Sequence, residues 1–255
     1  MRVTCDDLSL SYEARGRRVE ALGDVTFSVE EQEILCVLGP SGCGKTTLLK
    51  IIAGLLRPQR GRVTFTGERN GNPLTAMVFQ DHGLFPWMTV MENVAFGLAM
   101  RGLRRAEQEE RSLPLLERAG LARFARSYPH ELSIGMKQRA GLLRAIVTDP
   151  TVLLMDEPFA SLDAQTKLIL QDELLRILRD FPRPVIYVTH DIDEAILLGD
   201  RIIVLTGRPG RVSQEFAVTL PRPRSLALLQ SPDFAWLKGE IWKSLETSVR
   251  EQARQ

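Results

Sequence analysis

The stretch ILCVLGPSGCGKTT, residues 34–47, decides the fold of this chain. Its five leading apolar residues are typical of a short strand buried on both faces of a sheet. They run directly into the pattern G-x-x-x-x-G-K-[ST], and a helical pattern follows over residues 45–55. Glycines in such a loop let backbone N–H groups converge on phosphate oxygens, and the helix start adds a favourable dipole. The sequence therefore predicts a nucleotide-binding loop between a buried strand and a helix.

This loop supplies most of the predicted nucleotide contacts. Lys45 is expected to reach the β- and γ-phosphates, and Thr46 is expected to hold Mg²⁺. The other loop positions assigned to nucleotide binding are Gly39, Pro40, Ser41, Gly42, Cys43, Gly44 and Thr47. Because Cys43 lies inside the loop, we expect alkylation of its thiol to block nucleotide binding.

Outward from this loop, further apolar runs recur along the chain. Their continuity, rather than alternation, is typical of strands covered on both faces, and helical patterns such as residues 164–180 separate most of them. The runs are AMVF (76–79), VLLM (152–155), VIYV (185–188) and RIIVL (201–205). The pattern predicts an α/β fold with a central, mainly parallel sheet. Alternation over residues 3–12 and 24–29 predicts an antiparallel β sub-domain at the start.

The segment 81–150 carries helical patterns at 89–101, 106–120 and 133–148, which predict an inserted helical sub-domain of about residues 85–150. We assign residues 1–220 to one nucleotide-binding domain.

A Pro-rich break, LPRPRS, separates this domain from a C-terminal helical tail, residues 221–255. The tail helix is expected to start with Ser231 as N-cap and Pro232 at the first helical position. We expect its apolar stripe to pack on its own domain; the alternative is that the stripe lies on a membrane surface. The stripe comprises Phe234, Leu237, Ile241, Leu245 and Val249.

Four of the apolar runs end in the glycine loop or in polar residues, and in open α/β sheets ligands lie beyond the carboxyl ends of the strands. Asp156 is expected to take the metal and the adjacent Glu157 to activate water, since both cannot fill one ligand position. His190 is expected to contact the γ-phosphate or orient the water, and Gln80 to offer an amide to metal or water. Tyr12 is expected to stack on adenine, with an ordinary sheet aromatic as the alternative.

A second helix N-terminus suited to binding an anion is predicted far from the phosphate loop, in ELSIGMKQRAGLLRA, residues 131–145. Ser133 is its expected N-cap, and a basic face follows. One nucleotide site in one chain does not explain two such helix starts.

Composition limits the class of protein. Among 255 residues, 33 Lys+Arg balance 32 Asp+Glu, so the chain lacks the basic excess of a nucleic-acid binder. The 3 cysteines show no metal-ligand spacing, which favours a reducing compartment. The start has no signal-peptide pattern, and no apolar run has the length of a membrane helix.

At this point the chain resembles the ATP-binding cassette (ABC) transporter ATPases, over about residues 3–220. GPSGCGKTT resembles the family's Walker A loop and VLLMDE its Walker B strand. Gln80 matches the Q-loop, SLD at residues 161–163 the D-loop with Asp163, and His190 the switch histidine. LSIGMKQR matches the signature, usually Leu-Ser-Gly-Gly-Gln. The resemblance implies a P-loop NTPase core that uses ATP and Mg²⁺.

The resemblance also implies a reason for the second helix start. In this family two cassettes pair head to tail, and each signature faces the ATP on the partner's Walker A loop. The resemblance thus assigns Ser133 and Gly135 to the γ-phosphate of a second copy of the chain. Ile134 and Met136 depart from the usual signature, and we expect ordinary helical geometry at Ile134.

Other segments resemble the nitrate/sulfonate/taurine importer group, among them GLFPWMTVMENVAFGL, FASLDAQTK and TGRPGRV. This implies a peripheral subunit on the cytoplasmic face of the inner membrane that drives uptake of a small, anionic solute. Its implied partners are integral membrane permease subunits and, indirectly, an extracytoplasmic solute-binding protein. We expect QDHGLFPWM, residues 80–88, to dock on the permease through Phe85, Trp87 and Met88, with packing inside the helical sub-domain as the alternative.

The alternatives are a DNA-repair or chromosome ATPase with the same cassette, another importer class, and a P-loop kinase. The first class carries long coiled-coil insertions before the signature, and this chain has none. A kinase needs an acceptor pocket and no signature helix.

Overall fold

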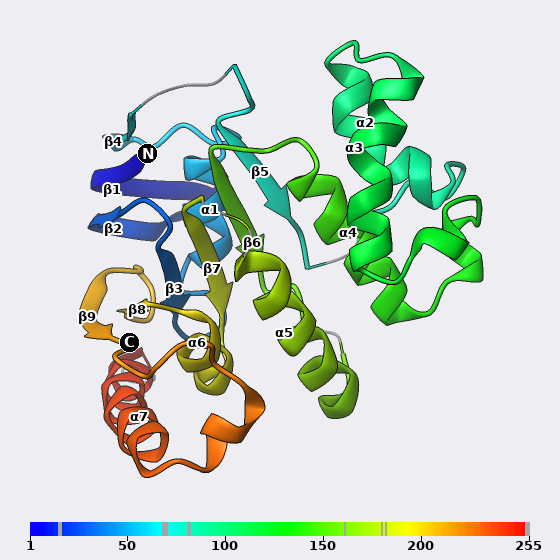
Figure 1. Ribbon diagram of the computed structural model, residues 1–255. Coiled ribbons are helices and arrows are strands. Elements are labelled where there is room, and N and C mark those ends of the chain that lie inside the picture. Colours follow the sequence, from blue (N-terminus) through cyan, green and yellow to red (C-terminus); the bar gives the residue numbers. More distant parts are fainter. Residues whose placement is uncertain are drawn as a thin grey trace.

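The computed structural model describes residues 1–14, 17–67, 71–80, 83–160, 162–179, 181 and 183–252. Its centre is a six-stranded sheet of order β5-β6-β7-β3-β8-β9 (Figure 1). The strands are β3 (Ile34–Leu38), β5 (Thr75–Val78), β6 (Val152–Asp156), β7 (Val185–Thr189), β8 (Arg201–Leu205) and β9 (Val212–Ala217). The pairs from β5 to β8 are parallel, and β9 adds an antiparallel edge. This confirms the predicted α/β class and the mainly parallel sheet.

The apolar runs became strands because both faces of the sheet are covered. Every residue of β3, β6 and β7 is buried. One face packs against α1 (Lys45–Ile52) and the N-terminal sheet in one core cluster. The other face packs against α5 (Ala164–Arg179), α6 (Ile192–Leu198) and α7 (Pro232–Gln252) in a second cluster.

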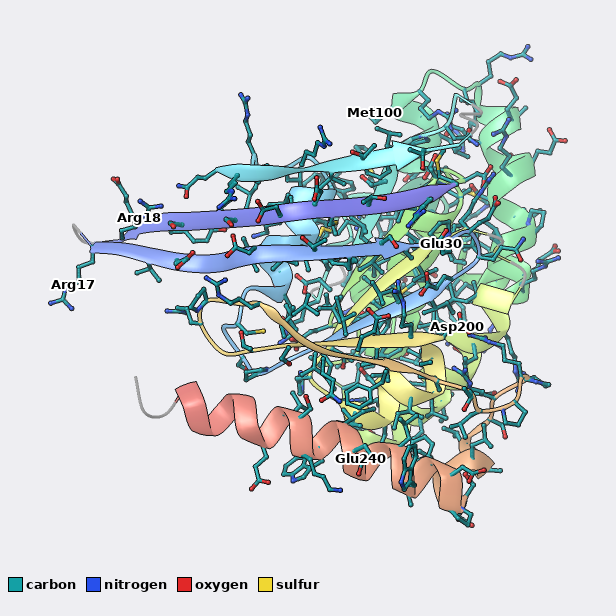
Figure 2. All side chains as sticks on the ribbon, turned by 90° about the vertical axis from the view of Figure 1, so that its left-hand side faces the viewer. Arg17, Arg18, Glu30, Met100, Asp200 and Glu240 are labelled. Atoms are coloured by element: carbon teal, nitrogen blue, oxygen red, sulfur yellow. The ribbon has the colours of Figure 1, made fainter. Side chains whose placement is uncertain are left out.

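The N-terminal sheet has the order β2-β1-β4 and is antiparallel, as predicted. Its strands are β1 (Arg2–Ala14), β2 (Arg17–Val29) and β4 (Arg60–Thr66). Figure 2 shows these strands side by side, with Arg17 and Arg18 at the tip of the long β1–β2 hairpin. Sequence reasoning missed β4 and β9, which are largely exposed edge strands without a continuous apolar run.

Three helices form a separate group beside the sheet (Figure 1). They are α2 (Val90–Met100), α3 (Arg105–Arg118) and α4 (Ile134–Ile146), and they match the three helical patterns. Their facing residues form a third core cluster, around Val94, Leu98 and Leu143. Short 3₁₀ turns lie at Ala122–Phe124, Pro129–Glu131 and Leu226–Gln230.

The C-terminal helix α7 packs on its own domain. Ser231 caps it, accepting a hydrogen bond from the Phe234 N–H at 3.2 Å. Phe234, Leu237 and Ile241 are buried in the core cluster beneath the sheet, and Leu245 packs against it. The side chain of Val249 lies outside the described residues. Within the described ranges, no helix has the length and apolar content to cross a membrane.

Candidate functional site

The carboxyl ends of the parallel strands bring the predicted groups to one edge of the sheet. The loop after β3 leads into α1 through Gly44, which has φ 100°. A Cβ at Gly44 would lie 2.7 Å from the carbonyl oxygen of Ala21, so glycine is required there. Above this loop lies an open cavity of about 600 Å³. Its lining comprises Tyr12, Val19, Ala21, Ser41, Gly42, Gly44, Lys45, Thr46, Thr47, Gln80, Glu157 and Arg208.

Lys45 lies along the floor of this cavity, with 4 % of its surface exposed. Its Nζ donates to the carbonyl oxygens of Gly39 and Pro40, at 2.8 and 3.1 Å. The same Nζ lies 3.3 Å from Oε1 of Glu157. The cation is thus fixed between the phosphate-binding loop and the end of β6, where it can attract an anionic phosphate.

Thr46 and Asp156 form the adjacent pair. The Thr46 hydroxyl donates to Oδ1 of Asp156 at 3.0 Å. Burial raises the pKa of the Asp156 carboxyl, and the hydrogen bond from Thr46 only partly opposes this shift. A hydroxyl and a single carboxylate beside a phosphate loop fit Mg²⁺, which is held by few protein oxygens together with substrate phosphates. Gln80, exposed at the end of β5, lines the same cavity.

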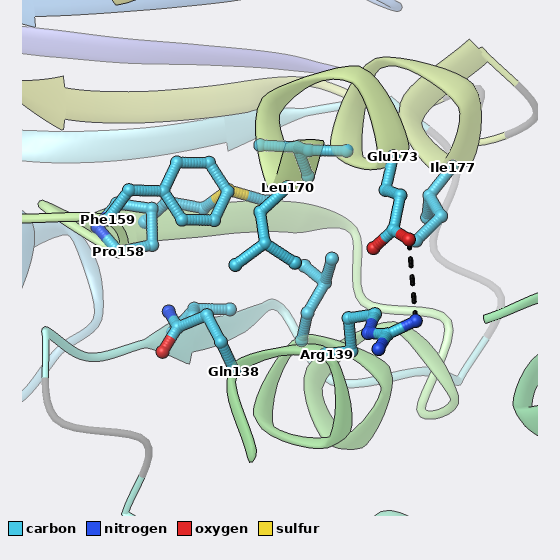
Figure 3. Close-up of a pocket in the computed structure, with 11 residues that line it drawn as sticks. Gln138, Arg139, Pro158, Phe159, Leu170, Glu173 and Ile177 are labelled. Atoms are coloured by element: carbon cyan, nitrogen blue, oxygen red, sulfur yellow. Dashed lines mark hydrogen bonds and ion pairs between the residues drawn. The ribbon is translucent and has the colours of Figure 1, made fainter. Parts of the chain in front are cut away.

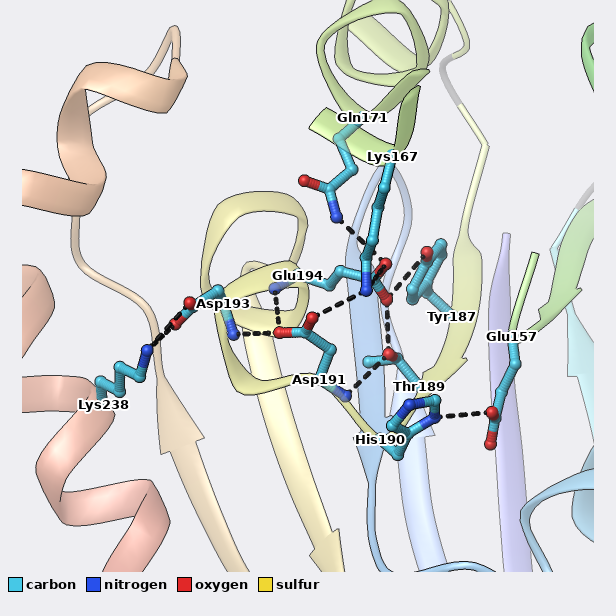
Figure 4. A network of polar contacts seen from close by, with 10 residues as sticks. All are labelled: Glu157, Lys167, Gln171, Tyr187, Thr189, His190, Asp191, Asp193, Glu194 and Lys238. Carbon is cyan, nitrogen blue, oxygen red and sulfur yellow. Dashed lines mark hydrogen bonds and ion pairs between the residues drawn. The ribbon is translucent and has the colours of Figure 1, made fainter. Parts of the chain in front are cut away.

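Glu157 faces His190 across the strand ends (Figure 4). Its Oε2 lies 2.7 Å from His190 Nδ1, and its backbone N–H donates to the Val188 carbonyl oxygen at 3.0 Å. Glu157 has φ 45°, a conformation that is uncommon for a non-glycine residue and frequent at functional sites. A carboxylate fixed between Lys45 and His190 can accept a proton from a water molecule at the cavity.

Tyr12 lies on the same cavity, and its hydroxyl is 3.2 Å from the Thr47 hydroxyl. Tyr12 belongs to strand β1, and its ring is exposed beside the nucleotide loop. Its position is therefore compatible both with an ordinary sheet aromatic and with stacking on adenine.

The structure corrects the expectation for the Cys43 thiol. The side chain is 0 % exposed and packs into the core beneath the loop. Burial raises its pKa, which suppresses the reactive thiolate. Alkylation of folded protein is therefore not expected at Cys43, and only its backbone remains available to a phosphate.

The signature segment lines a different cavity, of about 330 Å³, which shares no lining residue with the first. Ser133 caps α4, accepting from the Met136 N–H at 3.3 Å, and Ile134 and Gly135 lie in the first helical turn. Ile134 is not among the positive-φ residues, which confirms the expected helical geometry. Asp163 lines this cavity, whereas Ser161 of the same motif lies outside the described residues.

A small cavity separates α4 from α5 behind the signature (Figure 3). Arg139 of α4 faces Glu173 of α5 across it, with 3.4 Å between Nη1 and Oε1. Arg139 also donates to the Ala119 carbonyl oxygen at 2.8 Å. This ion pair ties the signature helix to the sheet domain.

Sequence reasoning missed three residues at the first cavity: Val19, Ala21 and Arg208. The first two belong to β2, and no local pattern links β2 to a loop some twenty residues away. Arg208 lies in TGRPGRV, a segment noted only for its resemblance to one importer group.

A network of polar side chains next to His190 connects α5, β7 and α6 (Figure 4). Glu194 of α6, 3 % exposed, accepts hydrogen bonds from Gln171, Tyr187 and Thr189. Lys167 of α5 lies 2.9 Å from Glu194 and 2.7 Å from Asp191. Burial lowers the pKa of Lys167, but its two carboxylate partners outweigh this and raise it.

We expect Lys167→Met to lower the free energy of unfolding by about 3 kcal/mol, because it leaves Glu194 buried without its cation. Denaturant unfolding near neutral pH measures this loss. Lys238→Met is the matched control, since Lys238 pairs with Asp193 on the surface, and its cost should be under about 1 kcal/mol. Equal losses in the free energy of unfolding for the two substitutions would contradict the stabilising role assigned to the buried Lys167–Glu194 pair.

At acidic pH the difference in the free energy of unfolding between wild type and Lys167→Met should become smaller. Burial raises the pKa of Asp191, but the hydrogen bond and charge of Lys167 outweigh burial and lower it. The stabilisation from a lowered carboxyl pKa is complete above the ordinary pKa and is lost as pH falls through the lowered one.

Comparison with known proteins agrees with this geometry. A family model described as "ABC transporter" matches residues 22–160. The taurine import ATP-binding protein TauB of Rhizobium johnstonii is 42% identical, over 92% of this chain and 93% of its own. The aliphatic sulfonates import ATP-binding protein SsuB of Bacillus cereus is 42% identical, over 88% of this chain and 89% of its own.

A solved structure shares the fold. It is described as a dimeric post-hydrolysis state of the ATP-binding cassette MJ0796 bound to ADP and Pi. It is 30% identical, with a TM-score of 0.73, and covers 86% of this chain and 100% of its own.

Proposed function

The chain belongs to the ABC transporter family as one of its ATPases, and from this premise we propose that it drives the import of a small sulfonate such as taurine. The 42% identity to both a taurine and an aliphatic sulfonate import protein supports this solute class. The proposed location is the cytoplasmic face of the inner membrane.

One observation carries the assignment of the hydrolytic site: Glu157 lies within 3.3 Å of Lys45 and 2.7 Å of His190 at the phosphate loop. We assign Lys45 to the β- and γ-phosphates and Glu157 to the proton of the attacking water. His190 orients Glu157 and the water. Thr46, Asp156 and Gln80 are the proposed ligands of Mg²⁺, which neutralises phosphate charge when bound. Tyr12 is the proposed platform for adenine.

A second copy of the chain completes the site. The cavity at Ser133, Gly135 and Asp163 shares no residue with the phosphate-loop cavity, yet it lies at the positive start of a helix. In a head-to-tail pair each signature would close on the partner's nucleotide, so that ATP joins the two copies. The dimeric MJ0796 cassette supports this arrangement.

We propose that the permease docks at Trp87. Phe85 is held inside the helical group: it packs on Phe96 with ring centroids 4.6 Å apart, and its N–H donates to Asn93 at 2.7 Å. Trp87 projects outward with 69 % of its surface exposed, and its ring lies 5.6 Å from that of Phe85. Aromatic residues are enriched at protein interfaces, which supports a docking role for this ring. Asp81 and His82 of the same segment lie outside the described residues.

The test of this function is uptake of labelled taurine and alkanesulfonates in a deletion strain complemented with wild type or Trp87→Ala. Wild type should restore uptake and copurify with a permease, and Trp87→Ala should reduce both while its ATP affinity stays unchanged. Trp236→Ala, at an equally exposed tryptophan on α7, is the matched control. Uptake restored only for unrelated solutes would refute the sulfonate assignment.

A further inference from the structure

The loop after β8, residues 206–211, is joined to β2 by backbone hydrogen bonds and an ion pair. The Gly210 N–H donates to the Ala21 carbonyl oxygen, and the Gly23 N–H donates to the Gly210 carbonyl oxygen, both at 3.0 Å. Arg211 adds an ion pair to Asp24 at 2.7 Å. Inside the loop, the Thr206 hydroxyl donates to the Pro209 carbonyl oxygen at 2.9 Å. The loop therefore has a fixed position next to the strand that lines the nucleotide cavity.

The same loop touches the phosphate-binding loop directly. A Cβ at Gly210 would lie 2.1 Å from the Cys43 carbonyl oxygen, so the two backbones meet where only glycine fits. Arg208 donates from Nη2 to the Gly42 carbonyl oxygen at 3.4 Å, and its side chain lines the cavity above the loop. A guanidinium is thus positioned at the rim of a phosphate site.

This guanidinium has no ion pair among the residues that the structure describes. Its neighbour in the loop, Arg211, is paired with Asp24, and Lys45 is paired with Glu157. Within the described part of the chain, Arg208 makes one long hydrogen bond, to a neutral carbonyl oxygen. A planar guanidinium matches phosphate oxygens, and a charge-assisted bond to phosphate is stronger than the contact it would replace.

The sheet order decides which part of a nucleotide Arg208 can reach. In the order β6-β7-β3-β8, the strands that directly precede Glu157 and His190 lie on one side of β3 and its phosphate loop. Arg208 follows β8, on the other side, where the loop is joined to β2. Arg208 therefore lies on the β2 side of the cavity, across the phosphate loop from the groups assigned to the attacking water.

We propose that Arg208 binds the non-transferred α- and β-phosphates of the nucleotide, as a second cation beside Lys45. This inference rests on the proposed nucleotide role of the cavity. Because ADP retains both of these phosphates, Arg208 contributes to the binding of ADP and ATP alike. It adds little to the chemical step, in which the γ-phosphate moves.

Arg208→Ala should raise the Kd for ADP and the KM for ATP by a similar factor, about five- to twentyfold, with kcat within about twofold of wild type. Isothermal titration with ADP and steady-state hydrolysis of ATP measure the two effects. Arg208→Lys should recover part of the affinity, since the charge remains but the planar fork is lost. The melting temperature should be unchanged, because Arg211 and Gly210 hold the loop.

Arg222→Ala is the matched control. It removes an arginine that pairs with Asp200, which directly precedes the amino-terminal end of β8, away from the cavity. The substitution therefore changes the net charge equally without altering the cavity lining. Unchanged ADP affinity in Arg208→Ala, or a fall in kcat at constant KM, would overturn the proposal for Arg208. Wild-type protein that binds no ADP would instead overturn the proposed nucleotide site itself.

Discussion

Glu157→Gln is expected to abolish turnover while leaving ATP bound. The amide keeps the size of the side chain and can still face Lys45 and His190, which lie 3.3 and 2.7 Å from the carboxylate. It cannot accept a proton from water, so we expect kcat to fall by about a thousandfold, within the range for loss of a general base. Steady-state phosphate release measures the loss.

The same variant should accumulate as an ATP-bound dimer, because the nucleotide that joins the two copies is no longer removed. Size-exclusion chromatography with ATP and Mg²⁺ reports this, and wild type under the same conditions should return to monomer. Glu240→Gln is the control, since Glu240 lies on α7 and pairs only with surface Lys243 in the described contacts. Normal turnover by Glu157→Gln would remove Glu157 from the proposed role.

The grouping of the proposed hydrolytic residues at one edge of the sheet was predictable from sequence, because each contributing segment carries a local pattern. β3, β6 and β7 are continuous apolar runs; β3 leads into the glycine-rich loop, and β6 and β7 end in polar residues, which the parallel sheet must bring to one edge. The capped start of α4 likewise depends only on neighbouring residues, since Ser133 accepts from the N–H three positions later.

The features that sequence reasoning missed depend on contacts between distant segments. Arg208 reaches the cavity only because its loop is hydrogen-bonded to β2, almost two hundred residues earlier. The thiol of Cys43 is buried because the loop backbone turns it inward onto the core, which the loop motif alone does not determine. The buried Lys167–Glu194 pair joins α5 to α6, and no spacing rule connects them.

Two inactive variants are expected to restore hydrolysis when they are combined in one dimer. Lys45→Ala removes the cation of the phosphate loop, and Gly135→Asp places a carboxylate where the partner's phosphate is proposed to lie. A Cβ at Gly135 has its nearest neighbours at 3.7 Å, on Thr166 and Leu170, so the substitution fits without displacing α5. An acidic residue in the first helical turn also favours the helix, so Gly135→Asp should fold normally. We expect each homodimer to hydrolyse ATP at about one per cent of the wild-type rate or less.

A mixed dimer carrying one substitution on each copy has one intact site, formed by the phosphate loop of the Gly135→Asp copy and the signature of the Lys45→Ala copy. Isolated through two affinity tags, it should recover up to about half of the wild-type rate per dimer, since one of two symmetric sites is complete. The matched control pairs a wild-type copy with a doubly substituted copy. That dimer carries the same two substitutions, but neither site is complete, and it should stay near background. The reverse result, with background hydrolysis in the first mixed dimer and about half of the wild-type rate in the control dimer, would show that each copy hydrolyses ATP with its own groups alone, because the control dimer retains one fully wild-type copy.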